Sequence, residues 1–310
     1  MMQHIDIIGV VITSLTVTIT LKYLFVGKKV FDDINFRSIH NTKATKSGGI
    51  GLFVTLFIFS FYYHINQIDL FDFSLLIPLG IMFLIGVYDD FYNADFKLKF
   101  FIQIIVAKIL IDQGLIIDDF YGVLGLNEIP RFAGQIFTIF VYLIIVNAIN
   151  FIDGIDGLAI TEAIKVILLV EFLSNDPTPF FSLGKLTLFS LLPLYYFNFK
   201  KDYKVFLGDA GSLFLGTLIA IYLFHVLGED FVLKPYYKVN KPLLSMALIS
   251  YPLIDLLRVF IIRVYNRRSP FNPDQNHLHH ILIKKGLNHI SAVGIIQIIS
   301  LSILYLIFYI

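Results

Sequence analysis

The sequence contains no cysteine and few charged residues, and both absences restrict the class of protein. Without cysteine, a disulfide framework and a thiolate metal site are excluded. Charged residues make up only 15% of the 310 residues, whereas a soluble domain has about a quarter. The formal net charge is +1, which gives no indication of a nucleic-acid partner. The composition therefore argues against a soluble domain.

Long hydrophobic runs fill most of the sequence. Hydrophobic residues make up 57% of the chain, and the mean hydropathy is +0.79. Because a helix needs about 20 apolar residues to cross a bilayer, we predict an all-α integral membrane protein with ten transmembrane helices, forming a single polytopic domain over residues 1–310. The ten expected spans are 5–25, 48–65, 70–88, 100–117, 132–149, 157–174, 180–199, 212–228, 242–262 and 289–310.

Lysine and arginine residues predict the orientation, because cytoplasmic loops are enriched in them. Most of those outside the expected spans lie in the odd-numbered loops, whereas the even-numbered loops hold only Arg131, Lys234, Lys238 and Lys241. This bias predicts that both termini lie outside the cell and that the odd-numbered loops are cytoplasmic. All the polar clusters described below fall in or next to odd-numbered loops, so we expect them to meet on one face of the membrane.

The adjacent residues Asp89 and Asp90 follow an apolar run at the end of the third expected span. Carboxylates at the end of a membrane helix are costly and are usually functional. Two adjacent carboxylates ionise together only with a cation nearby, so the pair suggests a divalent metal or a shared proton. The alternative is a solvated helix end, at which the two aspartates only stop the span.

A second cluster follows the fifth expected span. Asn147 and Asn150 are three residues apart, as are Asp153 and Asp156, and a spacing of three places each pair on one helical face. A glycine follows each aspartate and allows close approach of a ligand. These side chains suit a base, a ribose or a metal-bound phosphate. Helix capping is the alternative, and it explains only one or two of the four residues.

The eighth expected span begins at the sequence Phe206-Leu-Gly-Asp209-Ala-Gly-Ser212. A glycine-rich helix N-terminus favours anions, and an aspartate there could hold Mg²⁺ against a pyrophosphate. Phe206 could stack on a base. The alternative is that Asp209 or Ser212 is only an N-cap.

Three histidines, His277, His279 and His280, fall in the last odd-numbered loop. Imidazoles bind phosphate or zinc, but zinc usually requires wider spacing or a further ligand. Asp255 and Arg258 are three residues apart inside the ninth expected span, where we expect a buried structural pair.

Together these motifs resemble those of the polyprenyl-phosphate N-acetylhexosamine-1-phosphate transferases, in the branch that uses UDP-N-acetylglucosamine. The resemblance covers about residues 37–282. It implies that Asp89 and Asp90 activate the polyprenyl phosphate and bind metal, that Asp209 is the principal Mg²⁺ ligand, and that Phe206 contacts uracil. The other matched residues are expected to bind substrate: Asn147, Asn150, Asp153, Asp156, His277, His279, His280, and His40 and Lys46 in the first loop.

The first loop departs from the family pattern, H-x-x-P-T-P-R-x-G-G. Between His40 and Gly49 both prolines are missing, and Lys46 replaces the arginine. A lysine binds phosphate as a point charge and not bidentately, so the loop conformation and the sugar specificity are open.

The resemblance implies an enzyme of the bacterial inner membrane whose active site faces the cytoplasm. It would transfer N-acetylhexosamine-1-phosphate from a UDP-amino sugar, UDP-GlcNAc by default, to undecaprenyl phosphate within the lipid membrane. UMP would be released, and the step would initiate cell-envelope polysaccharide synthesis. Mg²⁺ is the expected cofactor, with Mn²⁺ as an alternative, and a homodimer is left open. We favour direct attack by the lipid phosphate over a covalent aspartyl-phosphate intermediate.

Other activities remain as alternatives. One is a phospho-N-acetylmuramoyl-pentapeptide transferase-like activity. Another is an ion-coupled transporter, which also keeps membrane carboxylates but places them near the midplane on broken, often repeated helices; no repeat is visible here. CDP-alcohol phosphotransferases share the D-x-x-D-G run of Asp153 to Gly157, but the rest of their motif does not follow.

Overall fold

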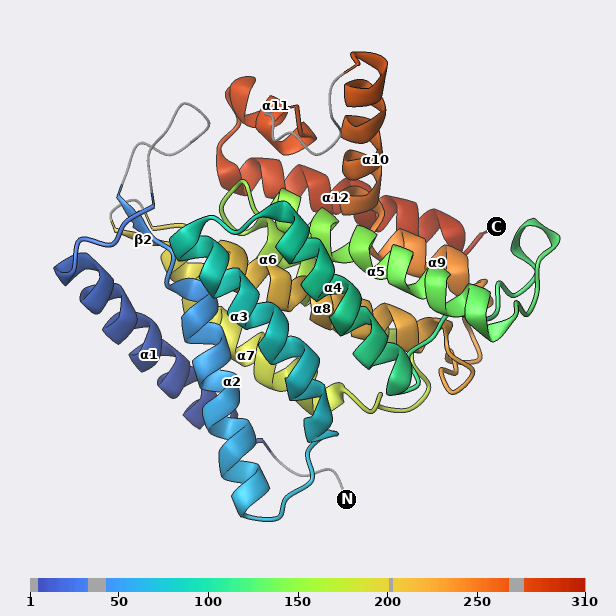
Figure 1. The fold of residues 1–310 in the computed structure, drawn as a ribbon, viewed down its shortest axis with the longest axis horizontal. Helices are drawn as coiled ribbons and strands as arrows, with labels where there is room; N and C mark the ends of the chain where they lie inside the picture. Colours follow the sequence, from blue (N-terminus) through green and yellow to red (C-terminus); the bar gives the residue numbers. More distant parts are fainter. Residues whose placement is uncertain (1–4, 33–42, 201–202, 268–275, 310) are drawn as a thin grey trace.

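The computed structural model describes residues 5–32, 43–200, 203–267 and 276–309, which are mostly helical (Figure 1). The helices are α1 (Ile7–Gly27), α2 (Gly48–Ile65), α3 (Leu76–Tyr92), α4 (Phe96–Asp112), α5 (Arg131–Ile152), α6 (Leu158–Leu173), α7 (Phe181–Asn198), α8 (Gly208–Leu227), α9 (Lys241–Leu248), α10 (Ser250–Tyr265), α11 (Leu278–Lys284) and α12 (His289–Ile307). Two short 3₁₀ helices cover Phe73–Leu75 and Val123–Gly125, and two strands, β1 (Ala44–Thr45) and β2 (Lys204–Val205), complete the described elements. Every apolar run that was expected to be a span contains a helix or a helix pair.

Six helices within the described residues are long and apolar enough to cross a membrane: α1, α2, α3 with its preceding 3₁₀ turn, α5, α8 and α12. The pair α9–α10 adds a seventh if it forms one span bent by 77°. The prediction of an all-α membrane protein is therefore confirmed. The count of ten stays a prediction, because α4 and α6 have only 17 and 16 residues and α7 does not meet the same test.

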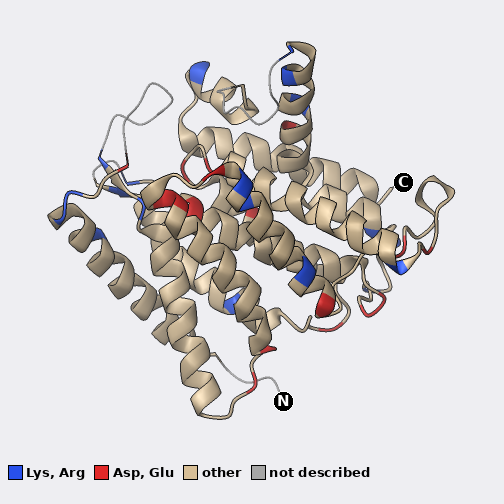
Figure 2. Cartoon of the chain, viewed as in Figure 1, with Lys and Arg blue, Asp and Glu red and all other residues tan. Residues whose placement is uncertain are grey.

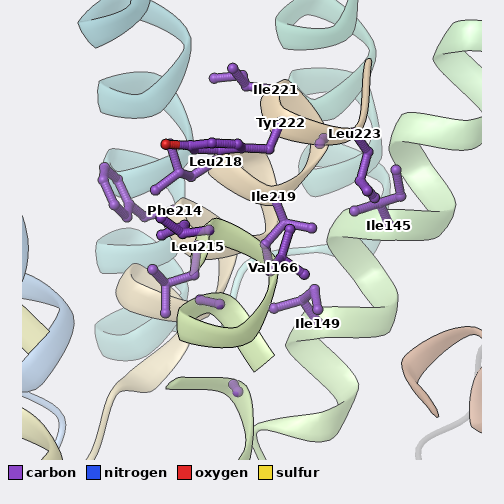
Figure 3. Packing of buried hydrophobic residues seen from close by; sticks show 14 of the residues in the cluster. Ile145, Ile149, Val166, Phe214, Leu215, Leu218, Ile219, Ile221, Tyr222 and Leu223 are labelled. Carbon is purple, nitrogen blue, oxygen red and sulfur yellow. The ribbon is translucent and has the colours of Figure 1, made fainter. Parts of the chain in front are cut away.

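Helix α8 forms the centre of the molecule. It is apolar on all sides, which is typical of a helix surrounded by others, and 94% of its apolar window is buried. Leu223 of α8 lies beside Ile145 of α5 (Figure 3). The buried side chains of Phe214, Leu218 and Tyr222 point to the other side of α8. The buried α8 is thus a fixed support for the polar residues at its N-terminus.

Glycines allow α2 and α3 to approach the start of α8 closely. A Cβ added at Gly86 of α3 would lie against the backbone of Asp209 and Ala210, closer than van der Waals contact. A Cβ added at Gly49 of α2 would meet the backbone of Gly211 in the same way. Small residues are what brings membrane helices into backbone contact, and here they place the end of α3 beside the start of α8.

The ninth expected span is broken between α9 and α10. Pro252 lies in the first turn of α10, where its missing N–H costs no hydrogen bond. Ser250, at the break, bonds to Ser300 of α12 through their hydroxyl groups at 2.9 Å. Ser300 also accepts a hydrogen bond from Lys165 of α6 (2.8 Å), so buried polar groups tie three helices together at the bend.

Candidate functional site

The helix ends converge at one end of the bundle. The ends of α3 and α5 meet the starts of α2, α4 and α8 there, as the contacts below show. Away from the helix ends, most of the ribbon carries neither acidic nor basic residues (Figure 2). The described residues of the polar clusters predicted from the sequence are therefore brought to the same end of the molecule.

Asp90 caps the N-terminus of α8. Its Oδ1 and Oδ2 accept hydrogen bonds from the backbone N–H groups of Asp209 and Ala210, each at 3.0 Å. The side chain is 3% exposed. A helix N-terminus favours an anion because its first N–H groups have no partner within the helix. Asp90 therefore fixes the end of α3 to the start of α8.

Asp89 and Asp209 share a bound ammonium group. Nζ of Lys99, in the first turn of α4, donates to Oδ2 of Asp89 at 2.5 Å and to Oδ2 of Asp209 at 2.7 Å. Burial alone would lower the pKa of Lys99, but Asp209 and Asp89 raise it above its usual value, so the ammonium stays charged. Two carboxylates from different helices thus already surround a cation.

Lys46 reaches the same site through a short backbone pairing. Strand β1 pairs in parallel with β2, and Phe206 continues the pairing by donating its N–H to the carbonyl of Thr45 at 2.8 Å. Nζ of Lys46 lies 3.0 Å from Oδ1 of Asp32 and 3.9 Å from Oδ1 of Asp90. Burial opposes its charge, but the carboxylates, led by Asp32, raise the pKa of Lys46. His40 lies outside the described residues.

The two asparagines of α5 bond to neighbouring helices. Asn150 donates to Oγ of Ser212 in α8 at 2.8 Å, so it lies beside the start of α8. Asn147, one turn earlier, donates to Oε1 of Gln103 in α4 at 2.8 Å. These bonds hold α4, α5 and α8 in register at the site.

Asp153 and Asp156 differ in their surroundings. Burial and the nearby carboxylates, led by Asp209, raise the pKa of Asp153 well above its usual value. Asp156 bonds to Nζ of Lys204, and its Oδ2 lies 2.8 Å from Nδ1 of His289. Burial alone would raise the pKa of Asp156, but His289 and Lys204 hold it below its usual value. Within the described part of the chain, Asp156 thus has cationic partners and Asp153 has only carboxylates as charged neighbours.

His277 is the N-cap residue of α11 and His279 and His280 lie in its first turn, not in a loop as expected. This segment, named the histidine loop, packs against the loop that carries Asp153 and Asp156. A Cβ added at Gly154 would lie 2.8 Å from Nε2 of His279 and 3.2 Å from Nε2 of His280. Nδ1 of His277 lies 2.7 Å from Oδ2 of Asp255. The expected Asp255–Arg258 pair is present, with Nη2 of Arg258 2.9 Å from Oδ1 of Asp255. Asp255 has a second role, because its bond to His277 holds the histidine loop.

Sequence reasoning did not assign Lys99, Lys204, Asp255 or His289 to this arrangement. Lys99 follows Asp89 by ten residues, which places it near the aspartate pair in the sequence, but the sequence does not show that it also reaches Asp209. The three-residue spacing of Asp255 and Arg258 suggested only an internal pair. The bond from Asp255 to His277 joins residues 22 positions apart, which no periodicity reveals.

The residues at the start of α8 fit a divalent cation. Among the described residues, no group of three or more His, Cys, Asp and Glu side chains is arranged to hold a metal ion. Mg²⁺, however, is usually bound through one or two carboxylates, with phosphates and water as the other ligands. Asp89 and Asp209 already hold the ammonium group of Lys99 between them, so their oxygens are placed to accept a cation.

The fold and site define a multi-pass membrane protein in which carboxylates and lysines gather at the ends of its helices. Residues 72–226 match the model of glycosyl transferase family 4. A probable undecaprenyl-phosphate N-acetylglucosaminyl 1-phosphate transferase of Bacillus subtilis (strain 168) is 30% identical over 298 residues, which are 93% of this chain and 79% of the relative. The chain therefore belongs to glycosyl transferase family 4.

Two further relatives are named undecaprenyl-phosphate alpha-N-acetylglucosaminyl 1-phosphate transferase. The protein from Yersinia pestis is 28% identical over 295 residues, which are 90% of this chain and 78% of the relative. The protein from Escherichia coli (strain K12) is 28% identical over 299 residues, which are 90% of this chain and 77% of the relative. The similarity thus extends over nearly the whole chain, well beyond the residues matched by the family model.

Proposed function

We propose that this protein transfers N-acetylglucosamine-1-phosphate from UDP-GlcNAc to undecaprenyl phosphate and releases UMP. The observation that carries the proposal is the pair of carboxylates, Asp89 and Asp209, held around one cation at a helix N-terminus. Such a site suits two phosphates that must approach each other. Membership of glycosyl transferase family 4 and the names of the relatives supply the sugar and the lipid acceptor.

In the proposed reaction, an oxygen of the lipid phosphate attacks the β-phosphorus of the UDP-sugar. The bond from this phosphorus to the bridging oxygen breaks, the oxygen leaves with UMP, and a diphosphate links the sugar to the lipid. Asp89 and Asp209 would hold Mg²⁺, which when bound offsets the repulsion between the anionic reactants and stabilises the leaving phosphate. Lys99 and Lys46 are placed to bind phosphate oxygens next to the carboxylates.

Asp90 has a positioning role in this proposal. Both of its oxygens accept backbone hydrogen bonds from α8, which leaves Asp89 as the member of the pair that contacts the cation. A covalent aspartyl-phosphate would require one of these engaged carboxylates to act as the nucleophile, so the geometry favours direct attack by the lipid phosphate.

The nucleotide and sugar would bind on the side of the later loops. Asp153 and Asp156 stand in one loop, and the imidazoles of His279 and His280 lie against Gly154 of the same loop. Phe206 lies between β2 and α8, three residues before Asp209, and in this proposal its ring stacks on the uracil. Asn150 supports the start of α8, and Asn147 supports α5 against α4.

The proposed site lies on the cytoplasmic face of a bacterial inner membrane. UDP-sugars are made in the cytoplasm, so they reach this face directly. The contacts support ten passages that alternate in direction. α9 and α10 together run from the far face to the site face, and α12 runs back. His289, at the start of α12, bonds to Asp156 at the site. Phe308, just after the end of α12, contacts the ring of Tyr237 on the far face. With this alternation the site contains only loops that the lysine and arginine bias predicts to be cytoplasmic.

Membranes that contain the protein, undecaprenyl phosphate and Mg²⁺ test the function with a panel of UDP-sugars. We expect UMP release with UDP-GlcNAc, and little release without the lipid phosphate. A preference for UDP-N-acetylmuramoyl-pentapeptide would replace the proposal with the pentapeptide transferase activity. Absence of lipid-dependent UMP release with every sugar would refute the transferase function.

A further inference from the structure

One face of α10 holds the histidine loop. Tyr251, Asp255 and Arg258 are spaced by four and three residues, so they share a helical face. Each of them contacts the segment from Asn276 to His279: Tyr251 through the imidazole of His279, Asp255 through His277 and Leu278, and Arg258 through the carbonyl of Asn276. In Figure 1, α10 and α11 project beyond the other helices at this end of the molecule.

Asp255 is the centre of this face. It is fully buried, and its Oδ1 accepts hydrogen bonds from the backbone N–H of Leu278 and from Nη2 of Arg258, both at 2.9 Å. Its Oδ2 lies 2.7 Å from Nδ1 of His277. Leu278 is the first residue of α11 and His277 its N-cap residue, so one carboxylate fixes both the start of that helix and an imidazole.

The contact with Asp255 determines which nitrogen of His277 carries a proton. An ionised carboxylate only accepts hydrogen bonds, so Nδ1 must donate, and Nε2 is the nitrogen that remains for another partner. His279 is arranged in parallel: its ring is stacked on that of His277 with an interplanar angle of 18°, and its Nδ1 lies 3.0 Å from the Tyr251 hydroxyl. Both Nδ1 atoms therefore face α10, and Nε2 of His279 faces Gly154.

Nε2 of His279 lies beside the Asp153–Asp156 loop. Nε2 of His279 is buried without a hydrogen-bond partner among the described residues, and it faces Gly154. Burial, followed by the nearby His280, lowers the pKa of His279 well below its usual value, so this imidazole is neutral. A buried polar atom without a partner is unfavourable unless a ligand satisfies it.

We propose that Asp255 is a positioning residue for the transferase reaction, which fixes the imidazole of His277 with Nδ1 protonated and directs its Nε2 to the UDP-sugar beside Gly154. This inference rests on the proposed function. Asp255 does not touch the substrate; it acts through His277. The Tyr251 hydroxyl holds the ring of His279 in place through its Nδ1, at 3.0 Å.

Histidine-selective ¹⁵N NMR of the detergent-solubilised protein tests the proton position without any activity. We expect the His277 signals, identified by their loss in His277→Gln, to show a protonated Nδ1, and to change in Asp255→Asn because an amide replaces the obligate acceptor. An unprotonated Nδ1 of His277 in the unmodified protein would overturn the inference while leaving the proposed function intact.

Kinetics with UDP-GlcNAc test the consequence. Asp255→Asn is expected to raise KM for UDP-GlcNAc about tenfold and to leave KM for undecaprenyl phosphate unchanged, and Asp255→Glu to recover part of the loss. Asp112→Asn, an exposed carboxylate at the far end of α4, is the matched control and should behave as the unmodified protein. Unchanged KM for UDP-GlcNAc in a folded Asp255→Asn protein, or an equal rise in both KM values, would contradict the positioning role. If the unmodified protein transferred no sugar-1-phosphate to undecaprenyl phosphate, the proposed function itself would be refuted.

Discussion

At the scale of single residues, Lys99 determines the electrostatics of the site. Its ammonium group lies between Asp89 and Asp209, two carboxylates that would otherwise repel each other. A cation that binds there must share these oxygens with Lys99 or displace it. Lys99 would then be released toward the phosphates of the bound substrates.

Replacing Lys99 tests this role. Lys99→Met keeps the apolar stem and removes the charge, and we expect kcat to fall about 10²-fold because a fixed cation near the reacting phosphates is lost. Lys97→Met, an exposed lysine in the same turn of α4, should have little effect. Rates of UMP release measure both variants, and equal rates for the two would show that Lys99 has no special part in the reaction.

The two adjacent aspartates should respond differently to Mg²⁺. Asp89→Asn and Asp209→Asn remove charge from the proposed metal site, so we expect at least a tenfold rise in the Mg²⁺ concentration that gives half-maximal activity. Asp90→Asn should lower the maximal rate and leave that concentration nearly unchanged, because Asp90 contacts the α8 backbone. Mg²⁺ titrations of the three variants measure this. A shift in Asp90→Asn as large as in Asp209→Asn would show that Asp90 also binds the metal.

At the scale of helices, the crossing of α3 and α8 positions the carboxylates. Gly86→Ala places a methyl group against the backbone of Asp209 and Ala210, which cannot give way as a flexible side chain would. We expect a loss of stability of about 1–3 kcal/mol and a large loss of activity, because Asp90 is moved away from α8. Gly80→Ala is the control on the same helix, where the added Cβ would meet the Phe53 ring at an ordinary 3.5 Å. The thermal unfolding temperature and the rate of UMP release should both fall in Gly86→Ala and change little in Gly80→Ala.

The buried ion pair of α6 supports the bend between α9 and α10. Nζ of Lys165 lies 2.6 Å from Oε1 of Glu162, and Lys165 also bonds to Ser300, which bonds to Ser250 at the bend. Glu162→Gln leaves a buried ammonium without its counter-ion, and we expect a destabilisation of about 3 kcal/mol. The double variant Glu162→Leu with Lys165→Met should regain much of this stability, as measured by thermal unfolding. A double variant no more stable than the single one would mean that the charges themselves are required.

At the scale of the whole molecule, the sequence predicted the helices and the meeting of the described polar clusters, because hydrophobic length and loop charge are local properties. It did not predict the bond between Asp255 and His277 or the bridge of Lys99 to Asp209, since both join residues that are far apart in the chain. The bend in the ninth span also escaped prediction, although Pro252 was a signal for the start of a new helix. The pairing of β1 with β2 involves only two residues in each strand, too few for a strand pattern.

The absence of native cysteine makes the topology directly testable. Leu124, in a loop predicted to face outward, is 92% exposed, and Tyr265, at the site end of α10, is 87% exposed. With a membrane-impermeant maleimide, Leu124→Cys should be labelled in intact cells and Tyr265→Cys only after permeabilisation. The reverse pattern would place the site outside the cytoplasm, and labelling of both in intact cells would show that they share a face.

The most direct test of the proposed reaction uses UDP-GlcNAc labelled with ³²P at the β-phosphate. The purified protein, undecaprenyl phosphate and Mg²⁺ should move the label into the lipid phase together with the sugar. At a Mg²⁺ concentration that is half-saturating for the unmodified protein, Asp209→Asn should transfer far less label while the variant remains folded. Sugar transfer that leaves the ³²P with the nucleotide, or full transfer by Asp209→Asn, would contradict a sugar-1-phosphate transferase site at the start of α8.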